Sequence, residues 1–307
     1  MQKQLLTLFS CMLVAQAVSA QKPDSAQAMV HYKFTWLRDT TQRDKPYTEN
    51  MVLFVGQNAS VYKSYDKKLQ ADLMKKQIQE QMASGAHNFN VSSRGESTSS
   101  EYFQFPNENK LIRKESLMTA YLIEEPFPII KWKIKADTST IGNLHCQKAM
   151  AHFKGRDYTA WFCSELPYRA GPWKLSGLPG LIVEAYDTKK EVVFKFDGID
   201  PVIKTNKVAS AATAAPQPGM RMIVIGGDDP NADPNLIALP DNGVKTTEKE
   251  FDNLKEAMRK DPNAFIQSAM GGSGMAMKPN PNMKTDIRIS SGPKTVINNP
   301  IELPEKK

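Results

Sequence analysis

Apolar and polar residues alternate along several short stretches in the first two thirds of the chain. In residues 29–37 the alternation places four apolar side chains on one face of an extended strand, namely Val30, Tyr32, Phe34 and Trp36. Side chains of a strand point alternately to its two faces, so a period of two predicts a strand with one face on a core. The same pattern, interrupted by turn residues, predicts strands at residues 51–55, 60–64, 101–105, 110–115, 119–124, 130–134, 146–153, 158–163, 181–186 and 191–196.

Residues 130–134 alternate without a break. The pattern predicts that Ile130, Trp132 and Ile134 face the core. The lysines between them are then expected to face water.

Two of the predicted strands flank the sequence Lys154-Gly-Arg-Asp157. This sequence predicts a hairpin whose two-residue Gly-Arg loop is of type II′. In that register Cys163 lies opposite Lys148, and Cys146 and Cys163 are diagonal neighbours on one face. A disulfide between them would then require a bulge or a small shift of the strands.

Two other stretches have the period of a helix. Between residues 66 and 83, apolar residues recur at helical spacing and lysines take the other side, which predicts an amphipathic helix capped by Asp66. Thr247, followed three residues later by Glu250, has the spacing of a capping box. It predicts a second helix over residues 248–260.

These elements predict an α+β fold. Repeated short strands joined by tight turns are typical of an antiparallel sheet, and no parallel crossover pattern is found. We therefore expect one curved antiparallel sheet or half-open β-barrel, with the helix at 66–83 inserted over its concave side and helices near the C-terminus.

The first 20 residues have the pattern of a secretory signal peptide. One early cation, Lys3, precedes a mostly apolar run and a small-residue ending at Val18-Ser-Ala20. An alternative interpretation takes Leu8-Phe-Ser-Cys11 as a lipoprotein cleavage box, which Phe9 suits poorly. No later stretch has the roughly 20 apolar residues that a membrane-spanning helix needs. The chain is therefore predicted to be exported, to the periplasm or in association with the outer membrane, without a transmembrane segment.

Composition adds a moderate positive charge. The formal net charge is +7, and it falls to +6 when Lys3 is lost with residues 1–20. The basic residues are scattered along the chain, which indicates a solvated surface and no nucleic-acid partner.

The predicted organisation has four parts. A signal peptide at 1–20 is followed by a β-rich domain at 21–203. Residues 204–245, which begin with a small, polar, proline-tipped tract, are predicted to be a linker or loop with an extra strand at 220–225. Residues 246–307 hold the C-terminal helices, the second at 262–270, and a flexible tail.

Removal of the signal peptide also removes Cys11 and leaves two cysteines, Cys146 and Cys163. Two cysteines in an exported protein indicate one disulfide. We therefore predict a Cys146–Cys163 bond despite the diagonal register.

Residues 171–187 combine three glycines and two prolines with a following strand pattern. Glycine permits positive φ and close backbone approach and proline fixes φ, so the segment is predicted to be a rigid corner. Its centre, Gly177-Leu-Pro-Gly-Leu-Ile182, resembles the signature of the GLPGLI family of secreted Bacteroidota proteins. Further pieces of the resemblance are Cys146-Gln-Lys-Ala149, Phe153-Lys-Gly-Arg156, Tyr158-Thr-Ala-Trp-Phe162, Gly171-Pro-Trp-Lys174 and the terminal Asn299-Pro-Ile-Glu-Leu303.

The resemblance implies an exported, mostly β protein of the cell envelope, in a family often encoded near outer-membrane transport systems. It implies no agreed activity and no set of catalytic residues. The expected function is therefore non-enzymatic binding of a peptide, a lipid or an outer-membrane transport protein. The aromatic and apolar residues at the corner and beside it are the candidate binding residues, namely Trp161, Trp173, Leu178 and Tyr186.

Two alternatives stay open. The donors His145, Cys146, Met150, His152 and Cys163 would suit a soft metal such as copper or zinc, with Met270, Met275, Met277 and Met283 as a second set. No close-spaced ligand motif accompanies them, so no cofactor or resident metal is expected. A hydrolase with an unrecognised site would need His152 to converge with a carboxylate such as Glu165 or Glu184.

Overall fold

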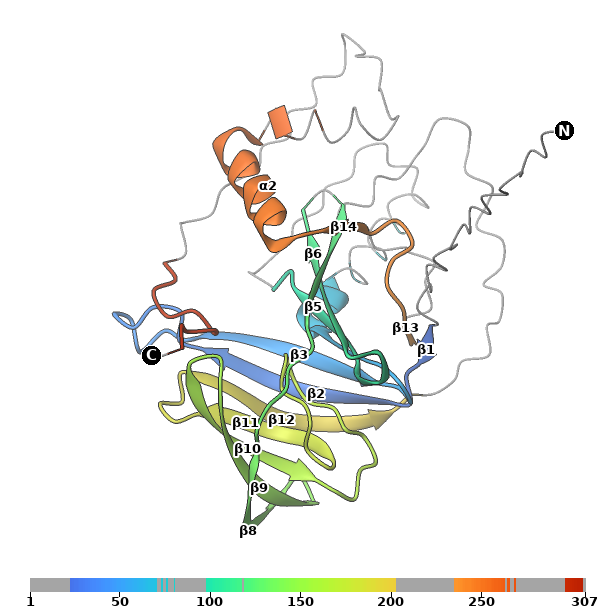
Figure 1. Ribbon diagram of the computed structural model, residues 1–307, viewed down its shortest axis with the longest axis vertical. Coiled ribbons are helices and arrows are strands. Elements are labelled where there is room, and N and C mark those ends of the chain that lie inside the picture. Colours follow the sequence, from blue (N-terminus) through green and yellow to red (C-terminus); the bar gives the residue numbers. More distant parts are fainter. Residues whose placement is uncertain are drawn as a thin grey trace, which may run out of the picture.

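Figure 1 shows a computed structural model of the chain. The structure describes residues 23–70, 98–117, 119–202, 235–262 and 296–305, together with the single positions 73, 76, 80, 264, 265 and 268. The predicted signal peptide, the strand predicted at 220–225 and the second methionine set lie outside the described residues.

One open 12-stranded sheet dominates the fold and is built from two meanders. The first comprises β2 (Ala28–Trp36), β3 (Tyr47–Val55), β4 (Ser60–Ser64), β5 (Glu101–Phe105), β6 (Lys110–Ser116) and β7 (Ala120–Pro126). The second comprises β8 (Lys133–Ile141), β9 (Leu144–Phe153), β10 (Arg156–Cys163), β11 (Leu181–Asp187) and β12 (Val192–Pro201).

The two meanders join where β12 pairs antiparallel with β2, from Val192 opposite Trp36 to Pro201 opposite Ala28. The predicted α+β fold with an open, curved antiparallel sheet is thereby confirmed. One departure is that β14 (Val244–Thr246) adds to β7 in parallel, at the far edge of the first meander. A separate small sheet pairs β1 (Asp24–Ser25) with β13 (Leu236–Ile237).

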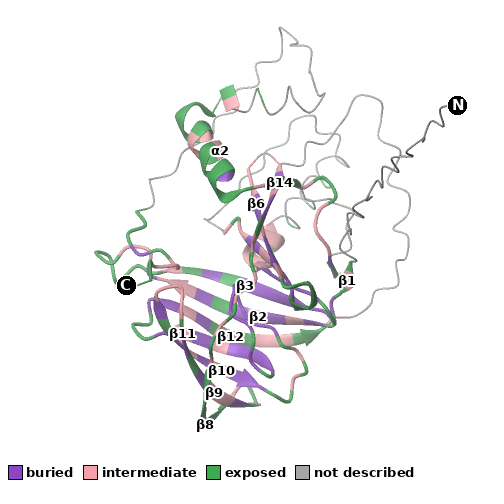
Figure 2. Cartoon of the chain, viewed as in Figure 1, coloured by how far each residue is buried: buried purple, intermediate pink, exposed green. Residues whose placement is uncertain are grey.

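The main core lies on the inner side of the curved sheet. Side chains from β2, β3, β9, β10, β11 and β12 form one buried cluster with the corner residues Trp173, Leu175 and Leu178 at its centre. Figure 2 shows buried residues along β2, β3 and β10 to β12, whereas α2 (Glu248–Lys260) is largely exposed. The second meander and the start of the first therefore curl around the corner.

A second, smaller core lies on the other face of the first meander. It includes Val52, Phe54, Phe103 and Ile237, and Tyr65 packs against it. Residues 65–70 are helical, so the inserted helix begins on this face. The prediction that it covers the concave side is wrong for its described start, because the corner fills that side.

The start of this helix also differs from the prediction. The Ser64 hydroxyl accepts a hydrogen bond from the amide of Lys67 at 3.0 Å and so caps the first turn. Asp66 instead accepts hydrogen bonds from the backbone and side-chain nitrogens of Asn50, both at 2.9 Å. Its carboxylate therefore ties the helix to β3.

The corner is rigid for identifiable reasons. Gly177 has a φ of 92°, and Trp173 adopts a φ of 55° although it is not glycine. At Gly180 a Cβ atom would lie 2.2 Å from the carbonyl oxygen of Cys163, so only glycine allows the two backbones to approach. The strand predicted after the corner, β11, is confirmed, and the glycines take the roles in positive φ and close backbone approach on which the predicted corner was based.

The β9–β10 hairpin turns one residue earlier than predicted. Lys154 and Gly155 both have positive φ, at 51° and 70°, and form the two-residue loop, so Arg156 pairs with Phe153. Two positive φ values define a type I′ turn, which matches the twist of the flanking strands. The predicted type II′ Gly-Arg loop and its register are wrong.

The stretch predicted as a strand at 130–134 is mostly lead-in to β8, which starts at Lys133 and forms the far edge of the second meander. Ile130 and Trp132 pack against the core, as predicted, but Ile134 is exposed. The Trp132 indole donates a hydrogen bond to the carbonyl of Ser176 at 2.8 Å. This contact places Trp132 over the corner.

Helix α2 follows the predicted capping box. The Thr247 hydroxyl accepts from the Glu250 amide, and the Glu250 carboxylate accepts from the Thr247 amide at 2.9 Å. Its buried residue, Phe251, lies 5.6 Å from Tyr121 of β7, centroid to centroid. Within the described ranges, no helix combines the length and apolar character needed to cross a membrane.

Candidate functional site

Residues 298–305 lie over the end of the sheet where β2 finishes and the β9–β10 hairpin turns. Three backbone–backbone hydrogen bonds join them to the other described residues: the amides of Asn298 and Asn299 donate to the carbonyl of Arg38, and that of Leu303 donates to the carbonyl of Lys154. Side chains make the other contacts. The segment is therefore held mainly by side chains, and the surface that residues 298–305 cover around Arg156 is called the groove below.

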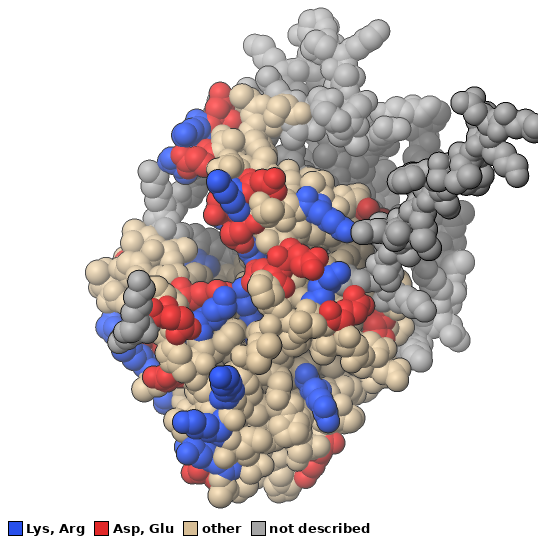
Figure 3. Space-filling view, in the orientation of Figure 1, with Lys and Arg blue, Asp and Glu red and all other residues tan. Residues whose placement is uncertain are grey.

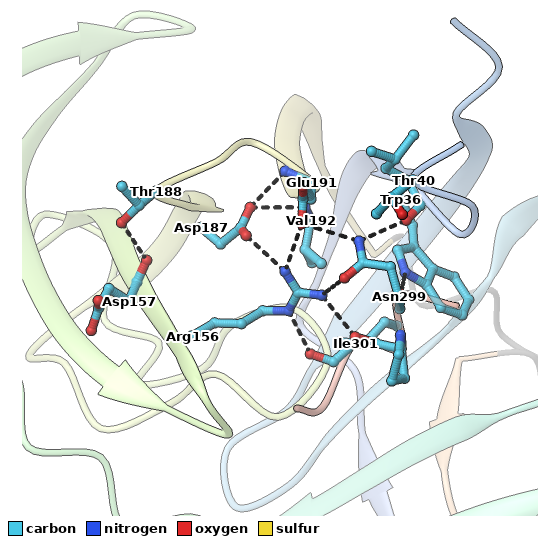
Figure 4. Close-up of polar contacts among 12 residues, drawn as sticks. Trp36, Thr40, Arg156, Asp157, Asp187, Thr188, Glu191, Val192, Asn299 and Ile301 are labelled. Carbon is cyan, nitrogen blue, oxygen red and sulfur yellow. Dashed lines mark hydrogen bonds and ion pairs between the residues drawn. The ribbon is translucent and has the colours of Figure 1, made fainter. Parts of the chain in front are cut away.

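Arg156, the first residue of β10, is the centre of this groove (Figure 4). Its side chain is only 3% exposed and its guanidinium uses all five N–H donors. Nε donates to the carbonyl of Ile301 at 2.9 Å, and Nη2 donates to the carbonyl of Pro300 and to Oδ1 of Asn299, both at 2.7 Å. Three of the five hydrogen bonds therefore go to residues 299–301.

The other two donors of Arg156 go to buried carboxylates at the end of β11 and just before β12. Nη1 lies 2.8 Å from Asp187 and 3.5 Å from Glu191. Asp187 also accepts from the amides of Glu191 and Val192, at 2.7 and 2.9 Å. A buried cation needs paired charge and fully used donors, and these carboxylates supply the paired charge.

Asn299 has a fully used amide side chain and is 5% exposed. Its Oδ1 accepts from Arg156, while its Nδ2 donates to the carbonyl of Leu37 at 2.8 Å and to Glu191 at 3.1 Å. The indole of Trp36 donates to its carbonyl at 2.8 Å. The groove thus presents one donor on one side of the amide and two acceptors on the other.

Two acidic residues of the segment meet basic groups of the groove. Glu302 lies 2.6 Å from the buried Lys174 of the corner and 2.9 Å from Lys154 of the hairpin turn. Burial favours the protonated form of Glu302, but the hydrogen bonds and charges of the two lysines outweigh it and lower its pKa. Lys174 also pairs with Glu125 at the end of β7. The corner therefore links the segment to the first meander.

An exposed histidine holds the far end of the segment. Nδ1 of His152 lies 2.7 Å from Asp157, and Nε2 lies 2.8 Å from Glu305, which also accepts from the amide of Gly155 at 3.1 Å. The hydrogen bonds to Asp157 and Glu305 raise the pKa of His152. The hydrogen bond to His152 in turn lowers the pKa of Glu305. This contact is ionic and titratable.

The structure separates the four predicted binding residues. Trp173 and Leu178 are 3% and 1% exposed and belong to the core. Trp161 and Tyr186 are half-buried on the outer face of β10 and β11, where Trp161 lies opposite Glu184 and Tyr186 opposite Thr159. Trp161 and Tyr186 therefore share one face as diagonal neighbours, and Trp173 and Leu178 lie apart from them in the core.

The corrected register brings the two cysteines together. Trp161 lies opposite Lys148 and Phe162 opposite Gln147, so the next step of the ladder sets Cys163 against Cys146. Both cysteines are buried and carry free thiols in this structure. Burial, followed by the nearby Cys163, raises the pKa of Cys146 to about 11.

The other predicted donors lie apart. His152 contacts Asp157 and Glu305 on the surface and has no contact with Glu165 or Glu184. Among the described residues, no group of three or more His, Cys, Asp and Glu side chains is arranged to hold a metal ion.

Sequence reasoning did not single out Arg156 or the partners that surround it. One signal was present, because Lys154-Gly-Arg156 and Asn299-Pro-Ile-Glu-Leu303 both carried the family resemblance. Nothing in the pattern of either stretch indicated that they meet in space.

Comparison with known proteins identifies a short family match. A family model described as "Protein of unknown function (Porph_ging)", a family typical of Bacteroidota, matches residues 154–184. The match begins at the hairpin turn, includes Arg156 and Lys174, and runs through the corner into β11. It is consistent with the GLPGLI resemblance, and no curated protein matches the sequence.

Solved structures give distant matches. The structure titled "Structure of PNGF-II in C2 space group" has a TM-score of 0.44 and 8% identity, over 75% of this chain and 32% of that chain. A second, "Structure of PNGF-II in P21 space group", has a TM-score of 0.40 and 9% identity, over 60% of this chain and 30% of that chain. The chain spans about a third of the length of these structures.

Proposed function

We propose that this protein is an exported, non-enzymatic binding protein of the cell envelope, and that it recognises a peptide segment of a partner protein. The binding site is the groove around Arg156, which the chain's own residues 298–305 fill in this structure. The manner in which those residues are held is the observation that carries the proposal.

Three features of the groove support peptide recognition. The carbonyls of Asn299, Pro300 and Ile301 all accept hydrogen bonds from side chains, so the groove contacts the backbone directly. The groove also has one buried position for a side chain and basic groups beyond it. Backbone contacts that give affinity, combined with pockets that give specificity, are the usual elements of peptide binding.

Displacement of the segment is also consistent with its place outside the sheet. Residues 298–305 belong to no strand of either described sheet. The segment can therefore leave the groove without breaking a strand pair, and a partner peptide can take its place.

The test uses the full chain with a protease site placed within residues 271–295. After folding and cleavage, a fluorescent peptide of residues 296–305 is added and its anisotropy is followed, with circular dichroism as the measure of fold. Uptake of the peptide in exchange for the cleaved segment, with the sheet intact, is the expected result.

A scrambled peptide of the same composition is the control for non-specific binding. Two outcomes would overturn the proposal. One is an intact fold that takes up no labelled peptide, and the other is loss of the sheet when the segment leaves, since the segment would then be a structural part of the fold.

A further inference from the structure

The groove also contains the means to select its peptide. We infer, resting on the proposed function, that it selects segments of the form Asn-Pro-apolar-acidic with a second acidic residue three positions later. Asn299, Pro300, Ile301, Glu302 and Glu305 occupy these positions in the bound segment.

The first position is specific for an asparagine amide. The Arg156 donor at 2.7 Å requires an oxygen, and the Leu37 carbonyl and the Glu191 carboxylate require a nitrogen that donates two hydrogens. Aspartate at position 299 would place a carboxylate oxygen, which accepts hydrogen bonds, against the Leu37 carbonyl and the Glu191 carboxylate. Both of these groups are also acceptors, and the Glu191 carboxylate is negatively charged. Alanine would leave one N–H of Arg156 and the carbonyl of Leu37 without this partner and would remove one of the hydrogen bonds to Glu191. Loss of one side of a buried hydrogen bond is costlier than loss of both sides.

The second position suits proline for a complementary reason. Pro300 has no N–H, and its carbonyl accepts from Arg156 at 2.7 Å. Its fixed φ also restricts the chain between Asn299 and Ile301 before binding, which reduces the entropy lost on binding. Ile301 packs against the main core at the third position.

The acidic positions differ in depth. Glu302 meets Lys174, which is buried, whereas Glu305 meets His152 at the surface, where both side chains are at least half exposed. Screening by water weakens an exposed pair, so Glu302 is expected to contribute more to selection than Glu305.

The experiment measures the affinities of variant peptides for the cleaved full-length protein. Because only the peptide changes, the fold of the protein is the same in every measurement. Peptides with Asn299→Asp or Asn299→Ala are expected to bind about tenfold to a hundredfold more weakly than the natural sequence, since buried hydrogen bonds to charged groups are lost. Glu302→Gln is expected to cost about tenfold and Glu305→Gln about twofold.

Asn298→Ala supplies the matched control. Asn298 is the neighbouring asparagine, but it is exposed and contacts Asp39 and Thr40 at the surface, so its loss is expected to change the affinity by less than about threefold. Equal affinities for the Asn299 and Asn298 variants would overturn the inferred selection and leave peptide binding in place. If no peptide binds at all, both the inference and the proposed function are wrong.

Discussion

Arg156 shows how one residue connects the fold with the groove. Its guanidinium is a planar fork whose five donors lie in fixed directions, and the two carboxylates behind it leave three donors for the bound segment. A lysine at this position would offer three donors around one point and could not reach the carbonyls of both Pro300 and Ile301. The geometry therefore depends on arginine and not on positive charge alone.

The first prediction concerns this residue. Arg156→Gln is expected to lower the free energy of unfolding by about 3 kcal/mol, because the buried Asp187 would lose the cation that neutralises it and Glu191 would keep only the exposed Arg43. Urea denaturation measures the change. Arg43→Gln is the matched control, since Arg43 also pairs with Glu191 but is 60% exposed, and a loss below about 1 kcal/mol is expected there. Similar losses for the two variants would contradict the central position of Arg156.

A second prediction at this scale is a pH dependence. The pKa of His152 is raised, so its contribution is complete below the ordinary pKa near 6.5 and is lost as pH rises through the raised value. The pKa of Glu305 is lowered, so its contribution is lost only as pH falls through that lowered value. Affinity for the 296–305 peptide is therefore expected to fall as the pH rises above about 6.5 and passes through the raised pKa of His152.

His152→Gln removes the titrating group and should flatten this dependence while it preserves the fold. Fluorescence anisotropy at a series of pH values, with ionic strength held constant, measures both proteins. A pH dependence that persists in the variant would mean that another group controls release.

At the scale of the element, the β9–β10 hairpin sets both the groove and the cysteines. The two-residue turn at Lys154 and Gly155 starts the ladder with a hydrogen-bonded pair, and every second pair that follows is of the same kind. The step that places Cys163 against Cys146 is then a non-hydrogen-bonded pair, in which Cα atoms lie only about 4.5 Å apart. That spacing is at the short end of the range found for disulfides.

We propose on this basis that the two cysteines pair after export. The bond should close the hairpin and add about 3 kcal/mol to the free energy of unfolding, the size expected for a loop of about 15 residues. Thiol titration of the unfolded protein, with and without reductant, is the measurement. An equal number of free thiols in both samples would exclude the bond. The double variant Cys146→Ser with Cys163→Ser is the reference from which the effect of the bond on stability is measured.

The corner gives another prediction for an element. Gly180→Ala would force a Cβ atom against the Cys163 carbonyl, and an expected loss of about 3 kcal/mol follows from the overpacking. Gly198→Ala is the control, because it has a φ of 139° but no atom within 4 Å of its Cβ position. Its loss should be near 1 kcal/mol, the cost of the backbone conformation alone. Equal melting temperatures for the two variants would mean that the strand and the corner can separate.

Strands and helices with one buried face could be predicted from the sequence, because burial leaves a hydrophobic pattern. Elements without a buried face could not. The alternation in β2 and the capping box of α2 gave the correct type of element because each reflects a local rule. Strand β8 is exposed along almost its whole length, so its polar run from Lys135 to Thr140 carries no hydrophobic signal. The hairpin register was missed by one residue because Lys154 adopts a positive φ that glycine was expected to supply.

The groove was harder to predict than the sheet for a related reason. Arg156 and Asn299 are 143 positions apart, and each has the composition of an ordinary surface turn. A polar residue that is buried because its hydrogen-bond partners surround it leaves no pattern in the sequence near it. Its burial can be predicted only when the partners are known. Trp173 and Leu178 were predicted to line a binding surface, although they lie in the core. An aromatic residue near a corner has the same sequence pattern whether it is exposed or part of the core.

At the scale of the whole molecule, the bound segment joins the two meanders at their common end. It contacts Trp36 and Arg38 after β2 on one side, and Lys154 and Arg156 of the hairpin on the other. Figure 3 shows basic and acidic residues interspersed over the face in view, which fits the paired charges along this junction. These contacts lie at one end of the sheet. Release of the segment should therefore affect that end and leave the rest of the sheet unchanged.

Hydrogen exchange followed by mass spectrometry tests this locality in the uncut chain. Asn299→Ala should raise exchange about tenfold or more in residues 296–305, in the turn after β2 and around Lys154, because about 1.4 kcal/mol of lost binding increases the released population tenfold. Strands β4 and β5, which pack in the second core, should keep their protection. Asn298→Ala is the control and should change exchange little. Faster exchange throughout the sheet would show that the segment supports the whole fold. Release of the segment from an otherwise intact groove would then be excluded.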